Sequence, residues 1–109
     1  MKKLSLIFGI MLLSVTAMLA QTTKTDTITV NGACGMCETR IEKATQAVKG
    51  VTKADWSSKT QQLIVTYDET KTEINKIHEA VSKVGHDTEL MKADDKTYNA
   101  LHGCCKYRK

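Results

Sequence analysis

The most constraining feature of the sequence is a strand and helix pattern that occurs twice along the chain. In the first half, Ile28 and Val30 alternate with polar residues, which is the period of a half-buried strand, and we expect this strand to end at Gly32. From Cys37 onward the apolar residues recur at the spacing of an amphipathic helix, and Gly50 follows as a helix stop signal. This helical stripe consists of Ile41, Ala44 and Val48.

A strand over residues 51–58 completes this first half, and the second half, residues 63–91, repeats the pattern. It contains a strand over residues 63–67, an amphipathic helix over 72–84 that Gly85 ends, and a short last strand over 88–91. The order strand, helix, strand, strand, helix, strand predicts an α+β fold of the ferredoxin-like βαββαβ kind, with an antiparallel sheet and both helices on one of its faces. Most apolar residues are needed for this two-layer core.

The N-terminus indicates export. Two lysines precede an apolar run over residues 4–13, and small residues follow, including Ala17 and Ala20. This is the layout of a secretory signal peptide, and the apolar run is too short for a stable membrane-spanning helix. We expect a signal peptide over residues 1–20 with cleavage after Ala20. Cleavage after Ala17 and an uncleaved anchor are the alternatives.

The remaining chain is expected to form one domain with a tail. Residues 21–91 would form the domain, beginning with a loose polar lead-in over 21–26, and residues 92–109 a cysteine-containing tail with one helical turn around 98–101. The net charge of +4 is small, aromatic residues make up 5% of the chain, and the basic residues are scattered among acidic ones outside the last four positions. This pattern argues against nucleic-acid binding.

The four cysteines form two close pairs, Cys34 with Cys37 and Cys104 with Cys105. In a short exported chain an even number of cysteines suggests disulfides, with three possible pairings. Close pairs are, however, what metal chelation or thiol exchange requires, and disulfides that staple distant segments would more often be spread along the chain.

The first pair lies between the first strand and the first helix. Two thiols separated by two residues can converge on one ion, and Cys37 lies near the helix start, where free N–H groups and the helix dipole favour a thiolate. Thiolates suit Cu(I) and Zn(II), but structural zinc requires four ligands, whereas Cu(I) accepts fewer. We therefore expect Cys34 and Cys37 to bind Cu(I), with Zn(II) possible if the tail supplied two more thiolates.

Four segments carry a family resemblance: G-A-C-G-M-C at 32–37, G-V-T-K-A-D-W at 50–56, L-I-V-T-Y-D at 63–68 and V-G-H-D at 84–87. Over about residues 26–91 the chain resembles the heavy-metal-associated domain family, which includes copper chaperones, metal-ATPase modules and periplasmic mercuric-ion binding proteins. The family pattern has a methionine where this chain has Gly32, and that methionine supports the loop without being a ligand.

The resemblance implies a ferredoxin-like fold and a metal site at the thiol pair. It also implies Hg(II) as an alternative to Cu(I), a periplasmic location, and a metal-transporting membrane protein or another thiol-rich domain as partner. The protein itself would be a monomer, or a dimer bridged by metal.

Three further side chains of the domain carry atoms that can bind a soft metal ion. His86 lies in the loop after the second helix, which in the family faces the metal loop, so it is either a third ligand or an exposed turn residue. His78 is expected on the flank of the second helix, and Met36 is expected to be an exposed loop residue rather than a thioether ligand.

The tail pair allows three interpretations. Cys104 and Cys105, with His102 nearby, could fold back to complete a multi-thiolate site, could form a separate capture or handover point, or could form disulfides. A disulfide between the two neighbours themselves would be strained.

The sequence thus favours a non-enzymatic metal carrier. A thiol–disulfide oxidoreductase is the main rival, because C-x-x-C is also a redox motif. The chain contains no proline and its strand and helix order differs from that of a thioredoxin core, so we consider this rival weaker. A domain held by purely structural disulfides is a third alternative.

Overall fold

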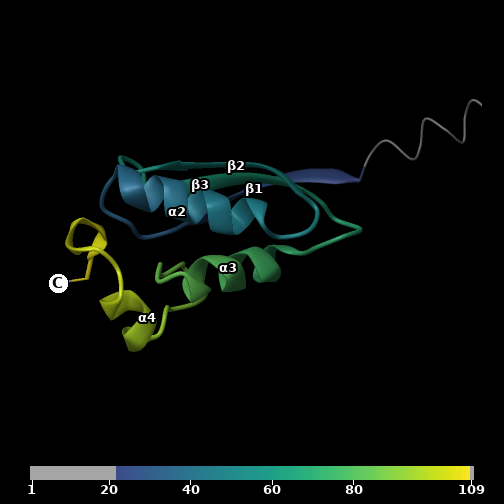
Figure 1. Ribbon diagram of the computed structural model, residues 1–109. Coiled ribbons are helices and arrows are strands. Elements are labelled where there is room, and N and C mark those ends of the chain that lie inside the picture. The colour runs from purple at the N-terminus through teal and green to yellow at the C-terminus, as the bar shows by residue number, and fades with distance from the viewer. Residues whose placement is uncertain (1–21, 109) are drawn as a thin grey trace, which may run out of the picture.

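The computed structural model describes residues 22–108, which form an antiparallel sheet with helices on one face (Figure 1). The expected signal peptide lies outside the described residues. Within them, no helix is long and apolar enough to cross a membrane. The elements are β1 (Thr23–Thr29), α2 (Gly35–Gln46), β2 (Val51–Ser57), β3 (Gln62–Asp68), α3 (Ile74–Lys83), α4 (Asp95–Asn99) and the short 3-10 helix η1 (Gly103–Cys105).

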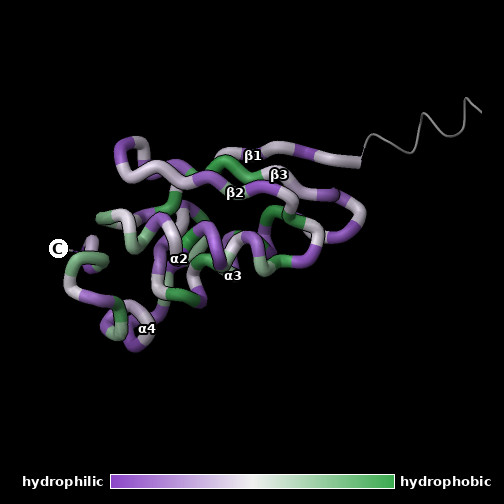
Figure 2. The backbone as a smooth tube through the Cα atoms, turned by 45° about the horizontal axis from the view of Figure 1, so that its top comes forward, coloured by the Kyte–Doolittle hydropathy of each residue, from purple (hydrophilic) through white to green (hydrophobic). Residues whose placement is uncertain are grey.

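The sheet has the strand order β1-β3-β2, and both pairings are antiparallel. Leu63 in the central strand lies opposite Ile28 of β1 and Trp56 of β2. All three side chains are buried, and they contribute to the core between the sheet and the helices. Figure 2 shows hydrophobic stretches in the strands and helices where these two layers meet. The predicted ferredoxin-like arrangement is confirmed.

The expected lead-in and last strand both differ from the prediction. Residues 23–26 are part of β1 because β3 offers them a pairing edge, and Thr25 adds a side-chain hydrogen bond to Thr66. The strand expected over 88–91 is reduced to a single bridge between Thr88 and Val30. The Thr88 hydroxyl accepts hydrogen bonds from the N–H groups of the second and third residues after it, which bends this segment into a turn.

The tail packs on the helical side of the sheet, at the end where α2 begins (Figure 1). Tyr98, Leu101 and Cys105 are buried members of the same hydrophobic core as the sheet. Leu101 lies against Gly85, which has a φ of +104° and ends the second helix as predicted. The tail is therefore packed into the domain.

Candidate metal centre

The thiol pair of the first loop is positioned by the start of α2. Cys34 is the residue before the helix, and its carbonyl accepts hydrogen bonds from the N–H groups of Cys37 and Glu38. This places the two sulfur atoms 3.8 Å apart. Cys34 is half-buried and Cys37 is fully buried, where it accepts a hydrogen bond from the Ala33 N–H at 3.4 Å. The helix begins two residues earlier than expected, so Cys37 lies within its first turn.

Trp56 supports the loop that carries the thiol pair. Its indole is buried and donates a hydrogen bond to the carbonyl of Val30 at 2.9 Å. A Cβ atom added at Gly32 would lie only 2.9 Å from the indole ring. The indole therefore occupies the space that a side chain at position 32 would need, which gives a physical reason for glycine where the family pattern has methionine.

The tail brings its two cysteines to Cys34. The sulfur of Cys34 lies 3.2 Å from that of Cys104 and 3.7 Å from that of Cys105. These three sulfur atoms all lie within 4.8 Å of one another, and all four cysteines are free thiols. Cys104 is exposed and also lies 3.5 Å from the sulfur of Met36, whereas Cys105 is fully buried. Among the three interpretations of the tail, this geometry is that of a fold-back onto the first pair.

Because the thiols lie close together, their pKa values differ from one another. The hydrogen bond with the Cys104 thiol is the largest of several effects that lower the pKa of Cys34 to about 6. The same hydrogen bond raises the pKa of Cys104, because an ionised Cys104 has no proton left to donate. Burial raises the pKa of Cys105, and the neighbouring thiols of Cys37 and Cys34 raise it further. At neutral pH, Cys34 is therefore a thiolate that faces two protonated thiols.

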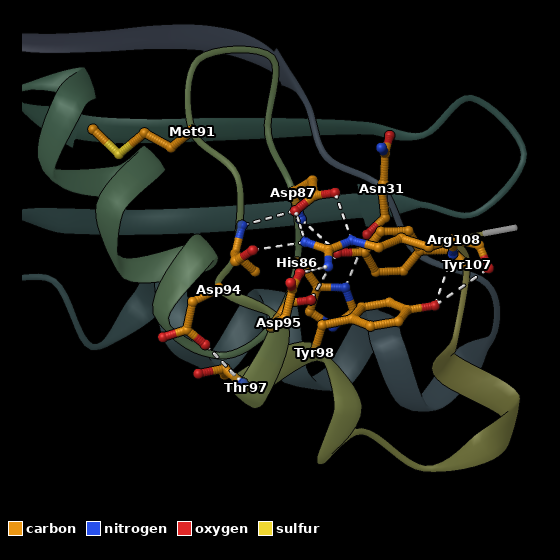
Figure 3. A network of polar contacts seen from close by, with 12 residues as sticks. Asn31, His86, Asp87, Met91, Asp94, Asp95, Thr97, Tyr98, Tyr107 and Arg108 are labelled. Atoms are coloured by element: carbon orange, nitrogen blue, oxygen red, sulfur yellow. Dashed lines mark hydrogen bonds and ion pairs between the residues drawn. The ribbon is translucent and has the colours of Figure 1, made fainter.

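Arg108 fixes the tail to the loop after α3 (Figure 3). Its guanidinium donates to both carboxylate oxygens of Asp87, at 2.8 and 3.2 Å, and to the carbonyl of Ala93 at 2.7 Å. The guanidinium also binds Asp95 and lies over the ring of Tyr98, 4.3 Å from its centre. Burial alone would raise the pKa of Asp87, but the hydrogen bonds from Arg108 and the Ala93 N–H outweigh it and lower the pKa.

Tyr107 provides a second attachment. Its hydroxyl donates to the carbonyl of Gly85 and accepts from the N–H of Asp87, both at 2.7 Å, and its ring stacks on His86. Burial raises the pKa of Tyr107 to about 12, so its hydroxyl stays protonated at neutral pH. Because Tyr107 and Arg108 lie two and three residues after Cys105, these attachments position the tail thiols. We call Tyr107, Arg108 and Asp87 the tail clamp.

The tail clamp was not predicted from the sequence. The last four residues look like a short basic run, and no local pattern assigns a role to Tyr107, Arg108 or Asp87. A usable signal was present, since a tyrosine and an arginine lie two and three residues after the cysteine pair, and the acidic Asp87 lies beside the candidate ligand His86.

The histidines lie apart from the sulfur cluster. His86 is fully buried rather than an exposed turn residue, its Nδ1 lies 2.8 Å from the carbonyl of Asn31, and its Nε2 has no hydrogen-bond partner. Burial lowers the pKa of His86. His78 is also buried, and its Nδ1 lies 2.7 Å from the Thr88 hydroxyl. His102 is exposed, directly before η1. Among residues 22–108, the side chains that lie close enough together to hold one metal ion are three cysteines, and no histidine belongs to this group.

Comparison with known proteins gives a consistent result. The family described as "Heavy-metal-associated domain" matches residues 27–87. The "Mercuric transport protein periplasmic component" of Pseudomonas aeruginosa is 36% identical over 79% of this chain and 93% of its own length. The protein of the same description from Shewanella putrefaciens is 36% identical over 83% of this chain and 98% of its own length.

Solved structures agree with these matches. Oxidized MerP from Ralstonia metallidurans is 35% identical, with a TM-score of 0.59 over 62% of this chain and 94% of that one. The CopZ metallochaperone is 30% identical, with a TM-score of 0.58 over 60% of this chain and 98% of that one. The family match ends at residue 87, so the tail thiols and two of the three clamp residues lie beyond it.

Proposed function

The chain belongs to the heavy-metal-associated domain family, and we propose that it binds a soft metal ion through Cys34 and Cys37 and passes it to a partner protein. The observation that carries this proposal is the pair of sulfur atoms 3.8 Å apart at the start of α2. Soft ions prefer thiolate ligands, and the helix start favours the charged form of a nearby thiol. The role is binding and transfer, without catalysis.

Transfer would proceed by exchange of thiolates. A thiolate of the partner joins the ion bound by Cys34 and Cys37, a three-coordinate intermediate forms, and one of the original sulfurs leaves. Cys34 is half-buried and Cys37 is fully buried, so the partner's thiolate approaches from the side of Cys34. Because this exchange transfers no electron, the ion keeps its charge throughout.

We propose Hg(II) as the first candidate ion and Cu(I) as the second. The sequence alone favoured Cu(I) because of its low coordination number. The relatives named for mercuric transport span 79% and 83% of this chain and nearly all of their own length, which supports Hg(II). The likeness to a domain of a potential copper-translocating ATPase, solved in its Cu(I)-loaded state, keeps Cu(I) as the alternative. Zn(II) depends on ligands beyond the first pair.

The comparisons also support a location and a kind of partner. The relatives described as periplasmic components support the export inferred from residues 1–20, and we propose a periplasmic protein. A solved neighbour, 27% identical with a TM-score of 0.59, is a domain of a potential copper-translocating ATPase. We propose a metal-transporting membrane protein or another thiol-rich domain as the partner of a monomeric carrier.

The test is an anaerobic titration of the reduced protein. Hg(II) would be added in the presence of a competing small thiol, and Cu(I) in the presence of a chromogenic chelator, with bound metal as the measurement. The double variant Cys34→Ser/Cys37→Ser is expected to lose tight binding of both ions, while His102→Ala, an exposed change near the tail thiols, retains it. Equal binding by the double variant and the unchanged protein would contradict the assigned site.

The redox rival is tested in the same preparation. Reduction of a protein disulfide substrate, measured in metal-free buffer, should remain at the level of free dithiol controls. Sustained turnover without metal would favour an oxidoreductase and overturn the carrier role.

A further inference from the structure

We propose that Cys104 and Cys105 join Cys34 and Cys37 as ligands of the same metal ion. The sulfurs of Cys34, Cys104 and Cys105 already lie within 4.8 Å of one another, whereas Cys37 is close to Cys34 and must approach at least one tail sulfur when the ion binds. The cargo of such a site is a soft divalent cation with coordination number three or four. This inference rests on the proposed role of Cys34 as a ligand. It adds that Cys104 and Cys105, which lie outside the part that matches the family, supply thiols that would otherwise come from a partner protein.

The spacing of the sulfur atoms supports this coordination. When each metal–sulfur bond is about 2.3 Å, sulfurs at the corners of a tetrahedron lie about 3.8 Å apart, whereas two sulfurs on opposite sides of a linear ion lie about 4.6 Å apart. Cys34 lies 3.8 Å from Cys37 and 3.7 Å from Cys105. Both distances match the edge of a tetrahedron, and neither matches a linear pair.

Two neighbouring cysteines can occupy such corners. They cannot lie on opposite sides of one ion, because their side chains start from adjacent positions of the short helix η1. Here both sulfurs lie on the same side, within 4.8 Å of each other and of Cys34. The distance from Cys104 to Cys34, 3.2 Å, is shorter than a tetrahedral edge. Cys104 is exposed, so its side chain can rotate to the required spacing.

The rest of the tail holds the pair in this position. Leu101 and Cys105 are buried in the core, and Tyr107 and Arg108 bind the loop after α3 through the hydrogen bonds of the tail clamp. The attachments therefore lie on both sides of the cysteine pair. A segment held in this way presents its thiols to Cys34 before any metal arrives, which reduces the entropy that binding must overcome.

The consequence is a competition between the tail and a partner protein. Each protonated thiol that binds the ion releases one proton to solvent, and no electron is transferred. A partner's thiolate approaching Cys34 meets a position that Cys104 already occupies at 3.2 Å. The ion is retained until the partner's sulfurs displace the tail pair, so the tail makes the site one of retention as well as transfer.

Cadmium is a suitable probe because it is a soft divalent ion that accepts four thiolates. The reduced protein would be titrated anaerobically with Cd(II), with affinity measured from the sulfur-to-metal charge-transfer band and the number of sulfur ligands from X-ray absorption. We expect three or four sulfurs in the unchanged protein and two in Cys104→Ser/Cys105→Ser, with affinity at least about tenfold weaker, since even the loss of a group that only orients a ligand costs that much.

Two further variants keep the test decisive. Cys105 is buried, so its replacement could disturb folding, whereas Cys104→Ser changes an exposed side chain and is expected to remove one sulfur from the count. His102→Ala, two residues before Cys104, is the matched control and should bind Cd(II) as the unchanged protein does.

The outcomes separate this inference from the proposed function. If the tail variants keep the sulfur count and Cd(II) affinity of the unchanged protein, the tail thiols are not ligands and this inference is overturned, while binding by the first pair stands. If Cys34→Ser/Cys37→Ser keeps the full affinity for Hg(II), Cu(I) and Cd(II), the proposed function fails and this inference fails with it.

Discussion

The guanidinium of Arg108 donates two hydrogen bonds to the carboxylate of Asp87, one to each oxygen, at 2.8 and 3.2 Å. The two residues are 21 positions apart in the sequence, and they connect the tail to the loop after α3. The pair is largely shielded from water, with side-chain exposures of 27% and 11%. It therefore bears on both the stability of the domain and the placement of the tail thiols.

Arg108→Ala is expected to lower the free energy of unfolding by roughly 2 kcal/mol, because it leaves a mostly buried carboxylate without its charged hydrogen-bond donor. Arg108→Lys should recover only part of the loss, since an ammonium group cannot donate to both oxygens in the same fork. Urea denaturation followed by tryptophan fluorescence measures both. Lys106→Ala, a change of an exposed residue in the same segment, serves as control, and an equal loss in that variant would contradict the assignment.

The same ion pair predicts a dependence on pH. The pKa of Asp87 is lowered in the folded state, so its contribution to stability is present above the unfolded value of about 3.9 and is lost as the pH falls through the lower folded value. Stability of the unchanged protein, measured from neutral pH down to about pH 3, should fall more steeply than that of Asp87→Asn in the acidic range. Parallel curves would show that Asp87 does not have this role.

The lowered pKa of Cys34 predicts selective thiol reactivity. Alkylation of the reduced, metal-free protein should modify Cys34 first, with a rate that rises around pH 6. Cys104→Ala removes the principal hydrogen-bond donor, so the midpoint should move to higher pH. Mass spectrometry of timed samples identifies the modified residue. His102→Ala should leave the profile unchanged, and an unshifted profile in Cys104→Ala would assign the low pKa to another cause.

The contact between Gly32 and Trp56 predicts the effect of restoring the family methionine. Gly32→Met places a Cβ about 2.9 Å from the indole, so it should destabilise the domain by roughly 1–3 kcal/mol through overpacking. Combination with Trp56→Leu should recover part of this loss, because the smaller side chain leaves room for methionine. Melting temperatures of the two single variants and the double variant test this coupling, and strictly additive losses would argue against a shared space.

The fold and the first thiol pair could be predicted because their signals are local. The alternation around Ile28, the helical stripe that includes Ile41 and the spacing of Cys34 and Cys37 are all visible within short windows. The prediction of a last strand over residues 88–91 was wrong. The Thr88 hydroxyl accepts hydrogen bonds from the N–H groups of Leu90 and Met91, and the apolar pattern does not reveal the turn that results.

The position of the tail could not be derived in the same way. Cys34 and Cys104 lie 70 positions apart, and no periodicity relates them. Their approach depends on Leu101 filling the space above Gly85 and on Arg108 finding Asp87. Such pairings become specific only in three dimensions, which is why the sequence left the use of the tail cysteines open.

The reduction of the fourth strand to one bridge also affects how copies of this protein behave at high concentration. Beyond that bridge, no β-ladder among residues 22–108 covers the outer side of β1, and an uncovered strand invites pairing with another molecule. Lys24 and Asp26 place a charge at alternate positions along that strand. Pairing of two copies along this edge would strip these charged side chains of water, so they help to keep the protein from aggregating.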